Sequence, residues 1–112
     1  MSSEFAPTVY LLASRRNGTL YVGVTSDLPE RIGKHRDGLL QGFTSDYGVR
    51  TLVWFERHGT MEQAILREKR IKKWNRAWKL ELIERDNPNW RDLAEDLGFE
   101  KLAPSGFPLS RE

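Results

Sequence analysis

The sequence contains no cysteine, so disulfide bonds and thiolate metal sites are excluded. It also lacks any apolar run long enough to cross a membrane. Residues 1–14 have no basic region and only a short apolar stretch, which is not the pattern of a signal peptide. From these absences we expect a protein of the reducing cytoplasm that has no membrane partner.

The net charge is also small, at +2 over 112 residues, but it is unevenly distributed. Residues 1–66 carry seven basic and seven acidic side chains. Residues 67–79 carry seven basic side chains and one acidic one, a net charge of +6, and residues 80–112 carry a net charge of −4. A short and strongly basic segment attracts phosphate groups, so the distribution favours a phosphate-bearing partner.

Residues 8–24 are predicted to form a β-hairpin, because two segments rich in β-branched and aromatic residues flank Asn17-Gly18. A two-residue turn there places Leu12 opposite Gly23. Because side chains alternate along a strand, one face then carries Tyr10, Leu12, Tyr21 and Gly23. The other face is the expected core side, with Val9, Leu11, Leu20, Val22 and Val24.

A helix is predicted to follow from Asp27, which is suited to cap it, to about Gly38. Leu28, Arg31 and His35 fall on one stripe of that helix, and Gly33 in its middle suggests that another group approaches closely there. The remaining pattern predicts a strand over 51–57, a helix over about 61–74 that is extended or rejoined over 80–85, and a short helix within 89–99. We expect one domain over residues 1–99 and a mobile tail over residues 100–112.

Glu68 is an unusual residue on the helix predicted to begin at Met61. It lies within an apolar stripe that also contains Ala64, Ile65 and Ile71. A carboxylate that faces a core or a cleft is unfavourable unless it is paired or binds a cation. Two interpretations therefore stay open: a buried ion pair with an arginine, or a metal ligand or catalytic carboxylate. Oxygen ligation with so few neighbouring carboxylates would suit Mg²⁺.

The basic segment REKRIKKWNRAWK, residues 67–79, contains two tryptophans. We expect Trp74 and Trp78 to be core residues that anchor the helix, with the basic side chains facing outward. Cations arranged in this way bind phosphates in a salt-dependent manner that does not depend on base sequence.

TVY at residues 8–10 and YVG at 21–23, followed by Arg31, His35 and Glu68, resemble the motif set of the GIY-YIG nuclease superfamily. The resemblance is closest to its small stand-alone bacterial members, which have a similar REKxIKKW helix and a downstream NPxW motif. It implies an α+β fold, a small three-stranded antiparallel sheet flanked by helices in the order β-hairpin–α–β–α–α. It also implies cleavage of phosphodiester bonds in DNA with one divalent metal.

The resemblance further implies a role for each matching residue. Glu68 would hold the metal, Mg²⁺ or Mn²⁺, and Arg31 would stabilise charge on the phosphate. Tyr10 would help to activate the attacking water, Tyr21 would position water or phosphate, and His35 would assist. The expected substrate contacts are Gly23, which allows close approach of the backbone, with Lys69, Lys72, Lys73 and Asn87, for which Asn89 is the alternative.

These residue types suit the chemistry, because a metal held by one carboxylate and a guanidinium both stabilise negative charge on phosphoryl oxygens. A tyrosine is a poor base near pH 7, so Tyr10 requires cations that lower its pKa, such as Arg31 and the metal. Two departures from the family pattern are present. TVY lacks the leading glycine, and Ser45-Asp46 stands where relatives often have a basic residue.

The leading hypothesis is a metal-dependent endonuclease that acts on nucleic acid, with DNA favoured over RNA. The alternative is a nucleic-acid-binding module of the same fold with little or no turnover. A module that binds neither nucleic acid nor metal has no need of the full Tyr–Tyr–Arg–Glu set. Repair, nucleic-acid turnover and defence are all open as pathways, and the substrate structure and the oligomeric state are open as well.

Overall fold

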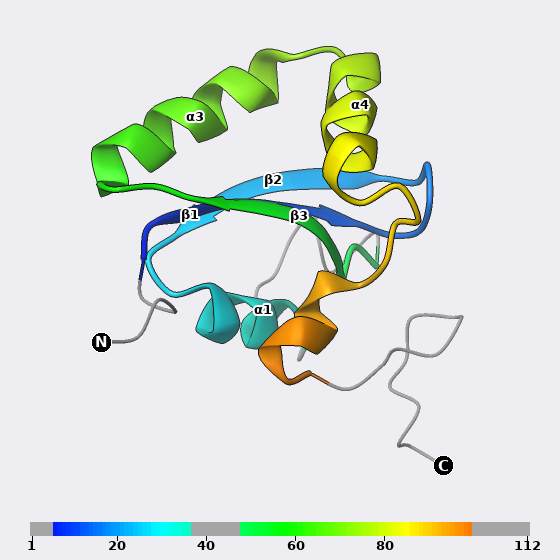
Figure 1. Cartoon of the computed structure of the whole chain (residues 1–112), viewed down its shortest axis with the longest axis horizontal. Coiled ribbons are helices and arrows are strands. Elements are labelled where there is room, and N and C mark those ends of the chain that lie inside the picture. The colour runs from blue at the N-terminus through cyan, green and yellow to red at the C-terminus, as the bar shows by residue number, and fades with distance from the viewer. Residues whose placement is uncertain (1–5, 37–47, 100–112) are drawn as a thin grey trace.

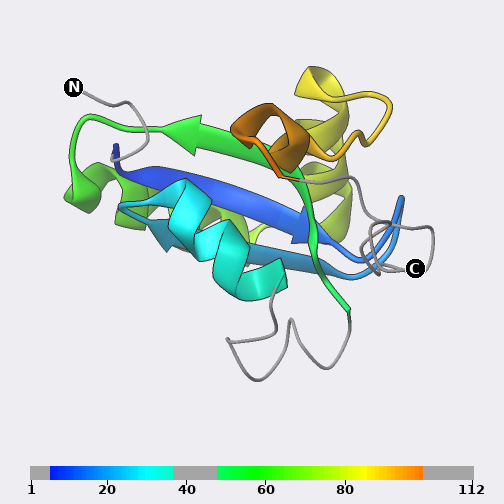
Figure 2. The ribbon, with the colours of Figure 1, turned by 90° about the horizontal axis from the view of Figure 1, so that it is seen from below.

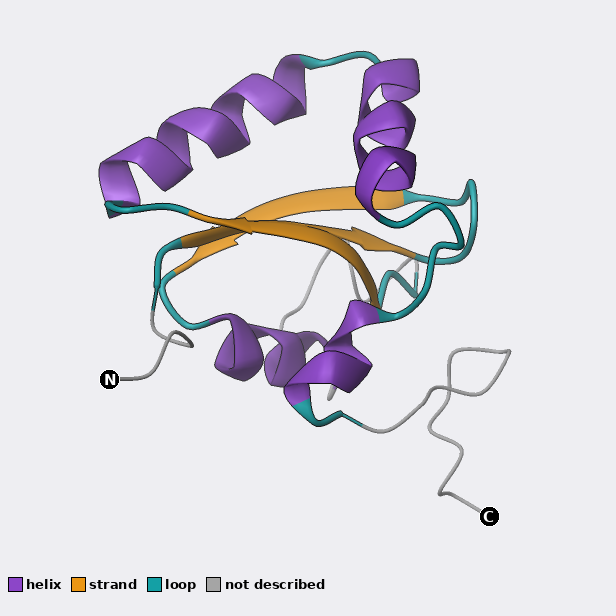
Figure 3. Ribbon diagram, viewed as in Figure 1, coloured by secondary structure: helices purple, strands orange, loops and turns teal. Residues whose placement is uncertain are grey.

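The computed structural model describes residues 6–36 and 48–99. Three antiparallel strands form one sheet in the order β2-β1-β3, so that β1 is the central strand. Figure 1 and Figure 3 show the sheet between two layers of helices. The predicted α+β class and three-stranded antiparallel sheet are therefore confirmed. The elements are β1 (Thr8–Ala13), β2 (Leu20–Thr25), α1 (Leu28–Arg36), β3 (Thr51–Arg57), α3 (Met61–Lys73), α4 (Arg76–Asp86) and the 3₁₀ helix η2 (Leu93–Leu97).

Both faces of the sheet are buried. Helices α3 and α4 cover one face, and α1 and η2 cover the other, as Figure 1 and Figure 2 show. Along β1, Val9 and Leu11 belong to the first core, and Tyr10 and Leu12 belong to the second; all four are fully buried. The alternation of faces was predicted correctly. The expectation that only the valine and leucine face is core was wrong, because α1 and η2 bury the tyrosine face as well.

The hairpin register differs from the predicted one by two residues. Tyr10 pairs with Gly23 and Leu12 pairs with Tyr21. The connection is a four-residue loop rather than a two-residue turn, with the Gly18 amide donating to the Arg15 carbonyl at 2.8 Å. Asn17 has a positive φ of 59°, a conformation that asparagine tolerates. A shift by two residues keeps every side chain on its predicted face.

Helix α1 begins as the sequence predicts, with the Glu30 amide donating to the Asp27 carboxylate at 3.2 Å. Two of its own residues, Leu28 and His35, are buried. A Cβ added at Gly33 would meet the Phe99 ring at 3.8 Å, which is ordinary contact, so no described residue makes the expected close approach. The predicted helix end near Gly38 and the loop that contains Ser45-Asp46 lie outside the described residues.

The segment from Met61 forms two helices rather than one extended helix. Thr60 caps α3 by accepting a hydrogen bond from the Gln63 amide. Trp74 ends α3 in an extended conformation, and Asn75 caps α4 by accepting from the Trp78 amide at 2.9 Å. This break leaves Trp78 54% exposed, so the prediction of a core tryptophan at Trp78 was wrong. Trp74 is partly buried and packs against the core.

The segment after α4 returns to cover the tyrosine face of the sheet (Figure 2). The Asp92 carboxylate accepts hydrogen bonds from Arg36 Nη2 at 2.5 Å and from the Leu52 and Ala94 amides at 3.2 Å. One side chain thus connects the end of α1, the start of β3 and η2. Residues 100–112, predicted to be a mobile tail, lie outside the described residues.

Candidate active site

Tyr10 lies across Gly23 on the neighbouring strand. A Cβ at Gly23 would be only 2.5 Å from both Cζ and Oη of Tyr10, so the phenol ring occupies the space that a side chain would fill. Gly23 is directly opposite Tyr10 in the register, and β2 is an edge strand. Gly23, which was predicted to allow close approach of the backbone to substrate, lets the Tyr10 ring extend over β2 in this structure.

Three rings pack together under the sheet. Tyr10 Oη is 3.0 Å from His35 Nε2 in a buried hydrogen bond. The centroid of the His35 ring is 5.8 Å from that of Tyr10 and 5.5 Å from that of Tyr21, both in edge-to-face geometry. The two tyrosine rings are 6.3 Å apart. The sequence prediction that Tyr10, Tyr21 and His35 share one site is consistent with this geometry.

Burial dominates the electrostatics of this cluster. It raises the pKa of Tyr10 well above the ordinary value of a tyrosine, and neighbouring Tyr21 adds to the rise. Burial also lowers the pKa of His35 to about 4, with a further contribution from the charge of Arg31. The imidazole is therefore neutral near pH 7. The role predicted for Tyr10 requires a lowered pKa. In the structure, however, burial raises the pKa of Tyr10 by more than Arg31 lowers it.

Arg31 projects from α1 toward the same cluster. Its charge and its side-chain hydrogen bond with Tyr10 both act to lower the pKa of Tyr10, although burial raises that pKa overall. Its charge also lowers the pKa of His35, in the same direction as burial. Its Nε atom is buried and forms no hydrogen bond within the described part of the chain. A buried N–H without a partner is unfavourable, and a guanidinium with a free donor is well suited to bind an anionic oxygen.

Glu68 reaches the cluster from α3, on the other side of the sheet. It is buried, at 8% exposed, and its Oε2 accepts a salt bridge from Lys72 Nζ at 2.7 Å. The ionised carboxylate also contributes to the raised pKa of Tyr10, and the pKa of Lys72 is raised by its hydrogen bond with Glu68. Of the two interpretations left open for Glu68, the ion pair with an arginine was wrong about the partner, because the pair is formed with a lysine one helical turn away. The i,i+4 spacing in the sequence was the available signal for it.

The other predicted substrate contacts are outside this cluster. Lys69 and Lys73 are exposed on α3. Asn87 is buried at the end of α4, where its amide group donates to the carbonyls of Val53 and Arg91 and accepts from the Arg91 amide. These bonds attach the segment after α4 to β3, the strand farthest from β2, and so give Asn87 a structural role. Asn89 is exposed.

The geometry can now be compared with known proteins. Residues 6–81 match the model of the GIY-YIG catalytic domain. The matched segment of this chain contains Tyr10, Tyr21, Arg31, His35 and Glu68. The chain belongs to the GIY-YIG family. The predicted resemblance is therefore confirmed, and the chain is a member of a nuclease superfamily.

Its relatives include small bacterial GIY-YIG proteins named UPF0213. One from Clostridium perfringens is 39% identical over 75 residues, covering 67% of this chain and 80% of the relative. One from Staphylococcus aureus is 35% identical over 84 residues, covering 75% of this chain and 98% of the relative. The solution structure of a UPF0213 protein from Bacillus halodurans is 27% identical, with a TM-score of 0.50, and the match covers 80% of this chain and 94% of that one.

The described residues contain no helix that is both long enough and apolar enough to pass through a membrane. They also contain no group of three or more histidine and acidic side chains arranged to hold a metal ion. Among the described residues, Glu68 is the one acidic side chain whose charge contributes to the shifted pKa of Tyr10.

Proposed function

We propose that this protein is a metal-dependent endonuclease that hydrolyses phosphodiester bonds in nucleic acid, with DNA favoured over RNA as substrate. The observation that carries the proposal is the convergence of Tyr10, Arg31, His35 and Glu68 from three separate elements beside the edge strand β2. Membership of the GIY-YIG family supports the same class of chemistry.

The residues present fit a single hard divalent cation. Glu68 supplies a buried carboxylate oxygen, and the described residues contain no group of three or more histidine and acidic side chains, so water and phosphate would take most coordination positions, as suits Mg²⁺. A cation bound there would neutralise charge on the phosphate and on the leaving oxygen. To bind the cation, Glu68 would first have to break its salt bridge with Lys72. The released Lys72 ammonium group would then be free to contact phosphate.

Arg31 is suited to hold the phosphate that is attacked. Its buried Nε–H makes no hydrogen bond within the described residues, so a phosphoryl oxygen would gain a donor without displacing a protein contact. The interaction would strengthen as negative charge develops on that oxygen, which is the condition for stabilising a transition state.

Tyr10 and His35 are suited to accept the proton of the attacking water together. The raised pKa of Tyr10 keeps its hydroxyl protonated, and neutral His35 lies 3.0 Å away. With Nε2 as the acceptor, the water gives a proton to Tyr10 Oη while Tyr10 gives its own proton to His35. Tyr10 then stays neutral throughout, and no buried phenolate has to form.

The decisive experiment uses supercoiled plasmid, single-stranded DNA, branched DNA and RNA, with Mg²⁺, with Mn²⁺ or with EDTA. We expect cleavage that requires the metal, and Glu68→Gln should reduce its rate by a factor of about 10²–10³ or more. Glu62→Gln, an equivalent change at an exposed position of the same helix, is the matched control. A Glu68→Gln protein that cuts at the wild-type rate would contradict the mechanism.

One observation favours a second candidate function, a nucleic-acid-binding module without turnover. The Glu68 carboxylate is already paired with Lys72, which satisfies its charge with no metal. That function predicts binding to DNA that weakens as salt is raised, with no cleavage in any metal. The same panel of substrates distinguishes the two candidates.

A further inference from the structure

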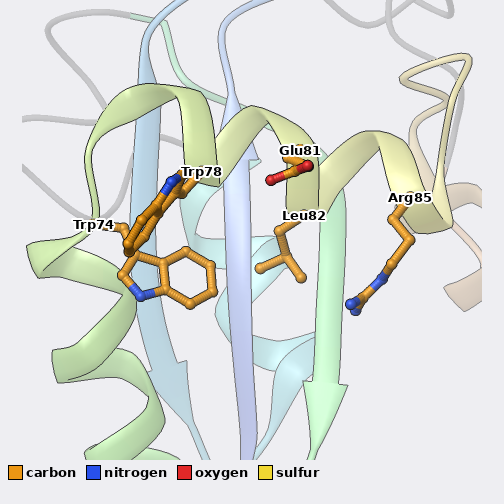
Figure 4. A pocket seen from close by; sticks show the side chains of 5 residues that line it. All are labelled: Trp74, Trp78, Glu81, Leu82 and Arg85. Atoms are coloured by element: carbon orange, nitrogen blue, oxygen red, sulfur yellow. The ribbon is translucent and has the colours of Figure 1, made fainter.

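A pocket at the junction of α3 and α4 lies apart from the candidate active site. Its volume is about 390 Å³, and Figure 4 shows the five side chains that line it, Trp74, Trp78, Glu81, Leu82 and Arg85. This volume falls in the range of small-molecule sites. Trp74 is the last residue of the REKxIKKW segment, but none of the five is among the residues to which the family resemblance assigns a catalytic or substrate-binding role.

The two tryptophans of the pocket differ from the other two in the chain. Trp54 and Trp90 are 2% and 7% exposed, and their indole N–H groups donate to Asp86 and Glu84. Trp78, by contrast, is 54% exposed. Trp78 is thus a large aromatic side chain that is exposed and also lines a pocket, so its ring can contact a ligand.

The geometry leaves the Trp78 ring available for stacking. Arg67 covers the Trp74 ring, with its Cζ 5.4 Å from the ring centroid. Trp78 meets Trp74 nearly edge-on, at 5.9 Å between centroids and 82° between planes. Trp78 remains 54% exposed beside this contact, and Figure 4 shows both indoles beside Leu82.

The surrounding charge selects the class of ligand. The segment 67–79 has a net charge of +6, and Lys69, Arg70 and Lys73 are exposed on α3 just before the pocket. An aromatic platform that continues a cationic helix face is the combination that binds single-stranded nucleic acid, with phosphates on the cations and bases on the aromatic ring.

The polar side chains of the pocket further restrict which bases it can bind. Glu81 presents a carboxylate, which only accepts hydrogen bonds at neutral pH. Arg85 donates from Nε to Asp86 at 3.3 Å, and this pair is exposed. Adenine, cytosine and guanine each carry an amino group that can donate to Glu81, whereas thymine does not.

We propose that the Trp74–Trp78 pocket binds one unpaired, amino-bearing base of the nucleic acid on which the active site acts. The base stacks on Trp78 and donates to Glu81, and the adjoining phosphates lie along the cations of α3. The inference rests on the proposed function, because it takes nucleic acid as the substrate. It makes that substrate single-stranded or branched near the cut, since a base within a duplex cannot enter the pocket.

Fluorescence anisotropy in EDTA tests the proposal with labelled dC and dT oligonucleotides of about 12 nucleotides and with a duplex. We expect the dC strand to bind more tightly than the dT strand. Trp78→Ala should weaken single-strand binding by about 5–140-fold and leave duplex binding unchanged, since one stacked base contributes about 1–3 kcal/mol. Glu81→Gln should reduce the preference for dC. Leu66→Ala, which truncates another exposed apolar side chain at 57% exposure, is the matched control.

The outcomes separate the two proposals. If the wild type binds no oligonucleotide and cuts no substrate, the proposed function fails. If it binds and cuts with metal, but Trp78→Ala binds single strands as tightly as Leu66→Ala does, only the pocket proposal is overturned. Sedimentation that shows a dimer of the wild type and a monomer of Trp78→Ala, with oligonucleotide affinity unchanged, would assign the pocket to a second copy of the chain and also overturn the proposal.

Discussion

The two faces of the sheet bury very different chemistry, although the same two strands of the hairpin supply both. On the α3 and α4 side, Val9, Leu11 and Val22 form an apolar core. On the α1 side, Tyr10, Tyr21 and His35 are held in contact with one another. On the first face, the side chains that the hairpin strands supply are apolar and stabilise the fold through their burial, whereas on the second face they include polar groups that need partners. Both candidate catalytic residues of the hairpin, Tyr10 and Tyr21, therefore lie on the second face.

Substitution of two adjacent residues on β1 should separate these contributions most strongly. We expect Tyr10→Phe to reduce cleavage by about 10²–10⁴-fold, because the hydroxyl that takes the proton is lost. Leu11→Ala should instead lower the free energy of unfolding by about 2–5 kcal/mol, because it leaves a cavity in the apolar core. Initial cleavage rates and urea unfolding of both variants provide the measurements.

The two variants serve as controls for each other. Cleavage by Leu11→Ala, corrected for the folded fraction, should stay near the wild-type rate. Equal loss of cleavage in both variants at full folding would contradict the division of roles between the faces.

Acid should destabilise the tyrosine face through His35. Burial lowers the folded-state pKa of His35 from 6.5 to about 4, so between these pH values the unfolded chain takes up a proton that the folded protein does not. The free energy of unfolding should therefore fall as the pH drops from about 6.5 to about 4 and then level off, with a total contribution approaching about 3 kcal/mol. Urea unfolding across this pH range, compared with His35→Gln, isolates the effect. A His35→Gln protein with the same pH dependence as the wild type would contradict it.

The substitution with the smallest expected effect, Gly23→Ala, adds one methyl group between β1 and β2. In Gly23→Ala the new Cβ would lie 2.5 Å from Tyr10 Oη, so the ring must move away from His35. We expect a loss of about 1–3 kcal/mol in unfolding free energy, together with reduced cleavage. Gly59→Ala is the control, because a Cβ there meets only Gln63 Oε1 at 3.5 Å. If both variants unfold at the same urea concentration, Gly23 does not make room for Tyr10.

The sequence predicted the elements and the faces of the strands well, because both depend on local patterns. β3 has the bounds that were predicted, and the cap at Asp27 formed as expected. The hairpin register was not predictable from Asn17-Gly18 alone. Gly18 has no positive φ, and a Cβ there would come within 2.4 Å of Ser14 Oγ, so the glycine serves a four-residue loop by its small size.

Contacts between distant segments were less predictable. The motif spacing brought the candidate site residues to attention, but it did not reveal that Gly23 makes room for Tyr10 or that burial controls the pKa of Tyr10. The exposure of Trp78 was also missed, since it depends on the break between α3 and α4 at Asn75. Each of these features requires the packing of one element on another, which the periodicity of one segment does not contain.

The docking of the segment after α4 has a consequence for where this protein can be shortened. The match to the family model ends at residue 81, so a chain cut there would keep every candidate catalytic side chain. It would lose Asp92, which ties α1 to β3, and the apolar cover that Leu93, Ala94, Leu97 and Phe99 provide over Tyr10 and Ile32. The stretch of sequence that carries the motifs is thus shorter than the stretch that keeps water away from them.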